Sequence, residues 1–189
     1  MTRQRMRVRK GAWVVTACAL AVAGCRSDRP PGPGDRLPDA ALEVVDPTGT
    51  TWSPGDRLVL SDLRGRPAFL DFWASWCPPC REQHRNLTEI AQRYGDRIAV
   101  VGILVDDTPG NALRWLEAQG ASYPTVREEK GVLAEAFWIP ATGLPHMALL
   151  DASGRLVWHQ VGASATGVPA GVLAQLDSIL QVMEGESAR

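Results

Sequence analysis

Hydrophobic and polar residues follow one another along the chain in segments typical of alternating strands and helices. Residues 68–74 (AFLDFWA) and 98–105 (IAVVGILV) are nearly continuous apolar runs with the length of buried strands. Between them, residues 78–94 have the pattern of a helix that ends at Gly95, with apolar side chains on one face at Leu87, Ile90, Ala91 and Tyr94. The pattern therefore predicts a central strand–helix–strand unit.

Shorter segments extend this unit on both sides. Two short strands, 42–45 and 50–53, flank the turn sequence Asp46-Pro47-Thr48-Gly49 and predict an N-terminal hairpin. After the central unit the pattern predicts, in order, a helix at 111–119, a strand at 123–126, a helix at 131–137, strands at 147–150 and 156–160, and a helix at 168–183. Together these elements predict an α/β fold in which helices flank a central mixed β-sheet.

The N-terminus has the pattern of an export signal. A basic stretch to Lys10 precedes an apolar run at 11–24, which is shorter than the roughly 20 residues of a membrane span. The residues VAGC, ending at Cys25, resemble a bacterial lipobox, which implies cleavage before Cys25 and lipidation of its thiol. We therefore expect a signal peptide at 1–24 and an exported lipoprotein that faces the periplasm or the cell exterior. An uncleaved anchor, or a plain signal peptide with a chance cysteine, stays open.

Composition divides the remainder into a tether, one domain and a tail. The Pro/Gly-rich stretch that follows Cys25 predicts a tether over 25–36, with a reach of roughly 30 Å. A single domain is expected over 37–184 and a frayed tail over 185–189. Without the five basic residues before position 25, 15 Lys and Arg face 21 Asp and Glu, which leaves a net charge of −6. This acidic balance gives no support for nucleic-acid binding.

Export leaves two cysteines free, Cys77 and Cys80 of FWASWCPPCR, since Cys18 is lost with the signal and Cys25 is consumed by lipid. Two thiols cannot form a four-cysteine zinc site. If Cys77 caps the helix, and the two prolines fill its first positions, the N–H groups and the helix dipole stabilise a Cys77 thiolate. One helical turn brings the Cys80 thiol within disulfide reach. Cys77 is then the exposed attacking thiol and Cys80 the buried resolving one.

The motif and its flanks resemble a known family. WCxxC after an apolar strand, with DFWA before it, is similar to thioredoxin. The signal, the tether, VVGILVDD and GLPHMALLDASGR resemble the membrane-tethered TlpA/ResA branch, over residues 37–183. The resemblance implies a thioredoxin-like fold with an added N-terminal hairpin and an insertion at about 123–137. It also implies a protein-disulfide oxidoreductase without a cofactor, whose redox group is a Cys77–Cys80 disulfide.

The same resemblance suggests the reducing direction and a set of partners. Its substrates would be protein disulfides, including those of apocytochrome c, and a membrane thiol donor would recharge the pair. We expect a monomer attached to a membrane by its lipid anchor.

Four further residues acquire roles from the resemblance. Pro145 matches the family's cis-proline, which faces the CxxC motif and, with Leu144, positions a substrate peptide. Trp76 matches the tryptophan beside the attacking cysteine; simple packing is the alternative, and the two roles are compatible. Asp71 matches a buried acid beneath the resolving cysteine, with a raised pKa and a role as proton relay. A carboxyl held only by structural hydrogen bonds is the alternative for Asp71.

The chain departs from the tethered branch at three positions. That branch usually has glutamate where Gln83 stands, proline where Arg85 stands and asparagine where Asp71 stands. Glu82 is adjacent, but a shift of one residue turns a helical side chain by about 100°, so it should not substitute. We therefore hypothesise that Asp71 takes over the proton relay that glutamate performs elsewhere.

Two other classes of function stay open. A copper-binding module would use Cys77, Cys80 and His146, but copper-delivery relatives space their cysteines CxxxC, so no metal is expected. A thiol peroxidase would need a threonine three residues before the cysteine, where this chain has Ala74. We interpret His84 and His159 as exposed, and His146 as a surface or groove residue.

Overall fold

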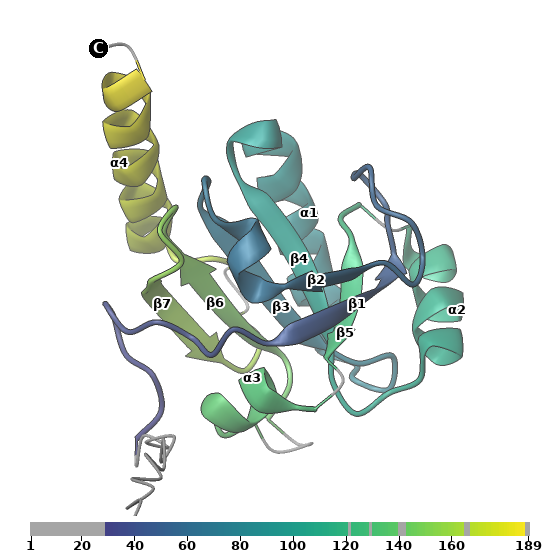
Figure 1. The fold of residues 1–189 in the computed structure, drawn as a ribbon. Helices are drawn as coiled ribbons and strands as arrows, with labels where there is room; N and C mark the ends of the chain where they lie inside the picture. The colour runs from purple at the N-terminus through teal and green to yellow at the C-terminus, as the bar shows by residue number, and fades with distance from the viewer. Residues whose placement is uncertain (1–28, 121, 129, 140–142, 165–166, 188–189) are drawn as a thin grey trace, which may run out of the picture.

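A computed structural model describes residues 29–189, apart from 121, 129, 140–142, 165–166 and 188–189. The expected signal peptide and the lipidation site at Cys25 lie outside the described residues. Over the described part of the chain one seven-stranded sheet has the order β2-β1-β5-β4-β3-β6-β7 (Figure 1). No helix in that part is long and apolar enough to cross a membrane.

The strands are β1 (Ala41–Asp46), β2 (Arg57–Val59), β3 (Ala68–Trp73), β4 (Ala99–Leu104), β5 (Thr125–Glu128), β6 (His146–Leu150) and β7 (Leu156–Val161). The α-helices are α1 (Cys80–Tyr94), α2 (Pro109–Gln119), α3 (Val132–Ala136) and α4 (Ala170–Ser187), and two 3₁₀ helices are η1 (Leu60–Leu63) and η2 (Gly95–Arg97). The expected mixed sheet flanked by helices is confirmed.

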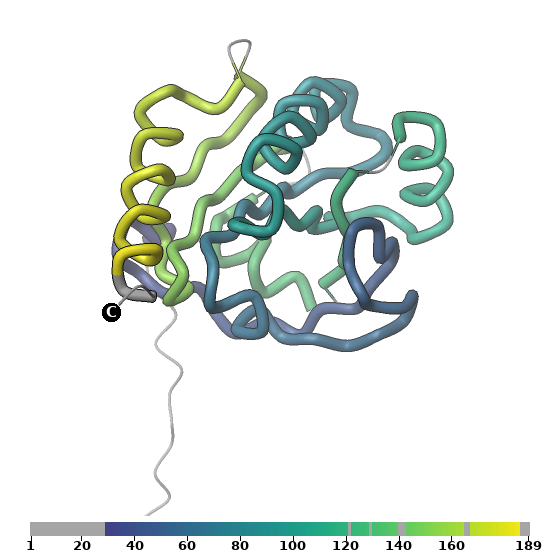
Figure 2. Tube along the Cα trace, turned by 90° about the horizontal axis from the view of Figure 1, so that it is seen from above, coloured from purple at the N-terminus to yellow at the C-terminus, as the bar shows by residue number. Residues whose placement is uncertain are grey.

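Strand directions explain how the helices are layered. β3, β4 and β5 run parallel, whereas β1, β6 and β7 each pair antiparallel with a neighbour. The crossovers through α1 and α2 move in the same direction across the sheet, and right-handed crossovers then place both helices on one face. Figure 2 shows α1, α2 and α4 together on that face. α3 and the segment around Leu37 lie on the opposite face.

β3 is buried along its whole length because both faces of the sheet are covered. Phe69 points toward α1 and α4, in a cluster that also contains Leu87, Ile90, Met147, Leu149, Val172 and Leu176. Leu70 and Phe72 point to the other face, in a cluster with Leu37, Leu42, Leu58, Leu63, Leu133 and Leu156. A fully buried leucine or phenylalanine contributes about 1.5–3 kcal/mol each, so this layered core fixes the strand that leads to the CxxC motif.

The expected N-terminal hairpin forms, but with a different second strand. β1 pairs with β2 at 57–59, and the predicted strand at 50–53 lies in the connecting loop. The Asp46 carboxylate accepts hydrogen bonds from the Thr48 N–H at 2.9 Å and hydroxyl at 2.7 Å. This local turn lengthens the loop, so the chain returns to β1 only at Gly55 and beyond.

The helices also differ at their ends from the pattern. The Thr108 hydroxyl caps α2 by accepting from the Asn111 N–H, and Pro109 takes the first helical position, so the helix starts two residues early. α4 continues to Ser187, so part of the segment expected as a frayed tail is helical. The segment expected as an insertion, 123–137, supplies β5 and α3.

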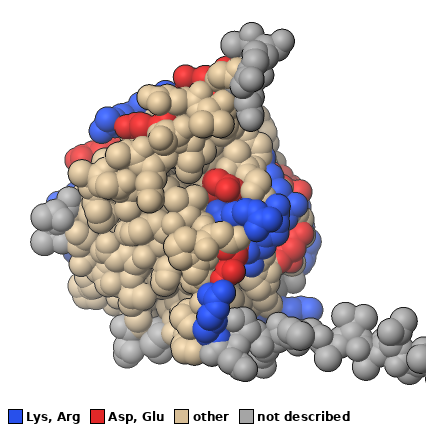
Figure 3. Space-filling model, turned by 90° about the vertical axis from the view of Figure 1, so that its left-hand side faces the viewer, with Lys and Arg blue, Asp and Glu red and all other residues tan. Residues whose placement is uncertain are grey.

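Charges on the face formed by α4 and β7 are mixed in sign. Figure 3 shows basic and acidic residues next to one another there, within a largely uncharged surface. Residues of opposite charge also form ion pairs, such as Arg29–Asp35 at 2.9 Å and Arg97–Glu184 at 3.6 Å.

Candidate active site

The CxxC motif lies where β3 passes into α1. Cys77 and Cys80 form a disulfide with a Cα–Cα distance of 5.4 Å. α1 begins at Cys80, so the two prolines lie in the preceding turn and not in the helix as expected. The Cys80 N–H donates to the Cys77 carbonyl oxygen at 3.2 Å, and is therefore not free for the sulfur. Cys77 still sits at the N-terminal end of α1, where the helix dipole favours a thiolate.

Both cysteines are buried in the disulfide form. Cys77 is 3% exposed and Cys80 is 1% exposed, so the expectation of an exposed Cys77 is wrong. The motif follows a fully buried strand, and its sulfurs pack in the same apolar cluster as Phe72 and Leu144. Trp76, in contrast, is 46% exposed and lies at the surface of the loop.

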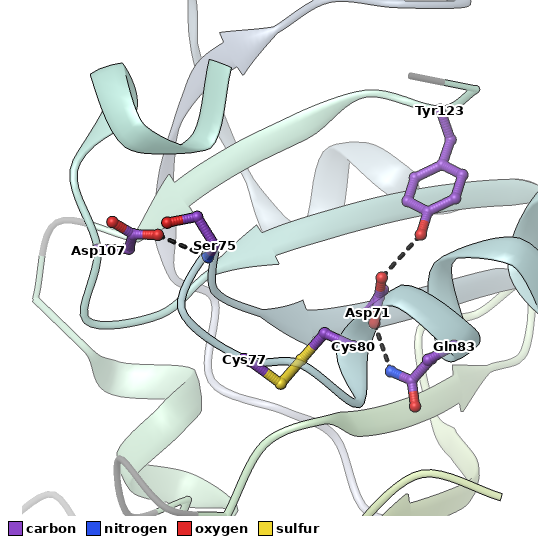
Figure 4. The surroundings of a disulfide bond; sticks show 7 residues. All are labelled: Asp71, Ser75, Cys77, Cys80, Gln83, Asp107 and Tyr123. Carbon is purple, nitrogen blue, oxygen red and sulfur yellow. Dashed lines mark hydrogen bonds between the residues drawn. A yellow bond between two sulfur atoms is a disulfide. The ribbon is translucent and has the colours of Figure 1, made fainter. Parts of the chain in front are cut away.

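Two acidic residues after β4 hold the loop that precedes the motif. The Ser75 N–H donates to Asp107 at 2.7 Å (Figure 4). The Trp76 indole N–H donates to the Asp106 carbonyl at 3.0 Å. Burial acts to raise the pKa of Asp107, but hydrogen bonds led by those from Ser75 lower it below its ordinary value. Because β3 and β4 run parallel, their C-terminal ends lie at the same edge of the sheet. The residues that follow β4 therefore lie beside the loop that follows β3.

Asp71 is the buried acid of the site, as expected. It lies on β3, is 1% exposed, and accepts hydrogen bonds from two side chains on its two carboxylate oxygens (Figure 4). The Gln83 amide donates to Oδ1 from α1, and the Tyr123 hydroxyl donates to Oδ2 at 2.7 Å. Burial raises the pKa of Asp71 to about 6, although both hydrogen bonds act to lower it.

Gln83 and Tyr123 are the residues of this network that the sequence reasoning missed. Gln83 is 2% exposed, although the sequence marks it only as the place of an absent glutamate. A signal was present, because Cys80, Gln83 and Leu87 share one buried stripe of α1 at helical spacing. Tyr123, expected only as part of a strand, is buried before β5, and its burial beside Asp71 raises its pKa well above 10.

Pro145 lies beside the motif, as the resemblance implied. The Leu144–Pro145 peptide bond is cis. β6 pairs antiparallel with β3 so that His146 is opposite Phe72, which places Pro145 at the end of β3 from which the CxxC loop departs. The Gly162 N–H donates to the Pro145 carbonyl at 2.7 Å and ties this bend to the end of β7. Leu144 is 8% exposed and packs in the core cluster that contains the cysteines.

The interpretation of the histidines as exposed or surface residues is wrong, because His84 and His146 are buried and His159 is half-buried. His84 is 4% exposed because Trp115 and Tyr123 pack against its ring, at centroid distances of 5.2 and 4.7 Å. His146 is fully buried and stacks on the half-buried His159, with centroids 5.3 Å apart. Burial, with the nearby His159, lowers the pKa of His146 to about 4.

Within the described residues, no three or more His, Cys, Asp or Glu side chains are grouped so that they could hold a metal ion. The cysteines and His146 therefore do not form the ligand set that a copper-binding module would use. The arrangement suits a different chemistry: a pair of sulfurs that exchanges two electrons, with a carboxyl behind it that exchanges a proton.

Comparison with known proteins agrees with this chemistry. The sequence profile of the Redoxin family matches residues 33–176. This chain belongs to the Redoxin family. Within that family it is 30% identical over 131 residues to a thiol:disulfide interchange protein DsbE homolog from Paracoccus denitrificans, a match that covers 68% of this chain and 70% of the relative.

Two further matches extend over more of the chain. Identity with the thiol-disulfide oxidoreductase ResA of Bacillus subtilis is 24% over 163 residues, covering 82% of this redoxin and 84% of ResA. A solved structure described as a thiol:disulfide interchange protein DsbE from Chlorobium tepidum superposes with a TM-score of 0.66 at 27% identity, over 79% of this chain and 99% of that one. This redoxin is a thioredoxin-like thiol–disulfide oxidoreductase.

Proposed function

We propose that this redoxin is a reductant of protein disulfides that works outside the cytoplasm, held at a membrane by a lipid on Cys25. The observation that carries the proposal is the Cys77–Cys80 disulfide at the start of α1, with the Asp71 carboxyl buried behind it. The resemblance to the tethered branch supports export, the anchor and apocytochrome c as a substrate. A membrane dithiol returns electrons to the oxidised pair, and the protein acts as a monomer.

The reaction proceeds in two exchanges. In the first, the Cys77 thiolate attacks a substrate disulfide, so that one substrate sulfur joins Cys77 and the other leaves as a thiolate. That thiolate takes up a proton from water, equivalent to the one that Cys77 released when it ionised. In the second, the Cys80 thiol gives its proton to Asp71, and the Cys80 thiolate attacks the Cys77 sulfur. The Cys77–Cys80 disulfide forms, and the second substrate thiolate leaves and takes up the proton from Asp71. Two electrons and two protons have then passed to the substrate.

Asp71 suits the second exchange because of its pKa. With a value of about 6, its carboxyl is largely ionised at neutral pH and ready to accept the Cys80 proton. The value lies closer to that of a thiol, about 8.5, than an ordinary aspartate does, which makes the proton transfer less uphill. Cys80 is 1% exposed, so bulk solvent has little access to its thiol and a buried base can take the proton instead.

The direction of electron flow is tested by the reduction potential of the full chain. The purified protein is equilibrated in redox buffers, and the fraction of the Cys77–Cys80 disulfide is measured by thiol alkylation. A potential near that of thioredoxin, about −270 mV, is expected. A potential near −120 mV would instead make the protein an oxidant and contradict the proposal. A Cys80→Ser variant should in addition trap substrates as mixed disulfides on Cys77, with Cys77→Ser as the control that traps none.

A further inference from the structure

The side chain of Gln83 has an unused hydrogen-bonding group beside the proposed proton relay. Its amide nitrogen donates to Asp71 Oδ1, while its carbonyl oxygen Oε1 is buried and has no hydrogen-bond partner. A buried carbonyl without a partner costs free energy, so a native structure that retains one calls for an explanation. The two ends of the amide exchange places by a rotation about the last side-chain bond.

We propose that Gln83 is a positioning residue that holds the Asp71 carboxyl in both of its protonation states, by turning its amide when the carboxyl gains a proton. The inference rests on the proposed function, in which Asp71 accepts the proton of Cys80. In the ionised state Oδ1 accepts from the Gln83 nitrogen. When the Cys80 S–H bond breaks and an O–H bond forms at Oδ1, that oxygen becomes a donor, and the turned Gln83 Oε1 accepts from it. One hydrogen bond to Gln83 exists in each state.

Tyr123 determines which carboxyl oxygen takes the proton. Its hydroxyl donates to Oδ2, and burial raises its pKa well above 10, so Tyr123 stays protonated as a donor in both states. Oδ2 is thereby fixed as an acceptor, and Oδ1 is left as the oxygen that can gain the proton. Figure 4 shows Tyr123 and Gln83 approaching the carboxyl from different sides, with Gln83 on the same helix as Cys80.

The other neighbours of Asp71 add no competing charge. In the sheet it lies between Gly102 of β4 and Met147 of β6, neither of which ionises. From α1, besides Gln83 and Cys80, comes His84, whose ring packs on Tyr123 and whose pKa is lowered by burial, so it is neutral at pH 7. Gln83 and Tyr123 are therefore the side chains whose hydrogen bonds respond to protonation of Asp71.

The test replaces Gln83 by methionine, which has a similar length and makes no such hydrogen bond. The reduced full-length protein is mixed with insulin as the disulfide substrate, and the single-turnover rate is followed between pH 5 and 9. The hydrogen bond to the ionised carboxyl is charge-assisted and stronger than the one to the protonated carboxyl, so its loss should move the midpoint of the rate profile up by about one pH unit. The rate should then fall about fivefold at pH 6 and about tenfold at pH 5, and recover above pH 8. Gln92→Met, on the exposed side of α1, is the matched control.

The same substitution in an Asp71→Asn background separates positioning from structure. There, Gln83→Met should change the rate less than about twofold, because no carboxyl is left to position. An equal loss at every pH, or an equal loss in both backgrounds, would show a merely structural role and overturn the proposal. Tyr123→Phe should also move the profile, whereas Tyr94→Phe, which removes a similar hydrogen bond to Asp177 at the far end of α1, should not.

A double variant guards against failure of Gln83→Met to fold. Asp71→Asn with Gln83→Glu moves the carboxyl across the same hydrogen bond from strand to helix. It should restore the pH-dependent rate that Asp71→Asn alone loses, and failure to do so counts against the paired arrangement. If the wild-type protein reduces no insulin, the proposed function fails and this inference with it. An active wild type with unmoved profiles refutes this inference alone.

Discussion

Replacing Asp71 by asparagine should make the protein more stable at neutral pH. The carboxyl has a pKa of about 6 in the folded chain against an ordinary value of 3.8, because burial disfavours its ionised form. As the pH rises, this carboxyl therefore ionises first in the unfolded chain, and the free energy of unfolding of wild type decreases between about pH 4 and pH 6. A difference of roughly two pKa units corresponds to about 3 kcal/mol. Asparagine has a similar shape and carries no charge to bury.

The measurement is the free energy of unfolding in urea, for wild type and Asp71→Asn, from pH 3.5 to pH 8. Both proteins are kept oxidised, and unfolding is followed by tryptophan fluorescence and circular dichroism. The stability of the variant relative to wild type should rise by about 3 kcal/mol across the window and then level off. Asp96→Asn, at the surface, corrects for the loss of one negative charge. A relative stability that stays flat from pH 4 to pH 7 would refute the account of Asp71 as an acid destabilised by burial.

Three further predictions concern other parts of the molecule. Gly102→Ala should cost about 1–3 kcal/mol of stability in urea, because its Cβ would lie 2.8 Å from the Trp73 ring nitrogen, whereas Gly110→Ala in α2 should not destabilise. Wild type should lose up to about 3 kcal/mol of stability as the pH falls from 6.5 to 4, because the folded chain keeps His146 neutral down to a pKa of about 4. His146→Phe should not show this loss. If the two proteins lose the same stability in acid, the prediction is contradicted. Cys25→Ser should abolish incorporation of a labelled fatty acid into the protein in cells. If the variant is still labelled, Cys25 is not the site of lipid attachment.

Local sequence patterns determined the central part of the fold. Continuous apolar runs identified β3 and β4, since a strand covered on both faces needs apolar side chains throughout. The CxxC motif was also visible in the sequence, because its two cysteines are only three positions apart. They fall at a strand-to-helix junction that the pattern located within a few residues. The partner of β1 was placed wrongly, because pairing depends on hydrogen bonds across a loop whose length turn residues alone do not set.

Only the tertiary structure decided what surrounds the motif. Asp71 contacts Gln83 and Tyr123, which are 12 and 52 residues away along the chain, so no local period could report both contacts. The burial of His84 likewise depends on a tryptophan from α2 and a tyrosine from before β5. A helical or strand period tells which side of an element faces inward. Packing between segments that are distant in sequence decides which residues it contacts there. The same packing buries Asp71 and so raises the pKa of its carboxyl.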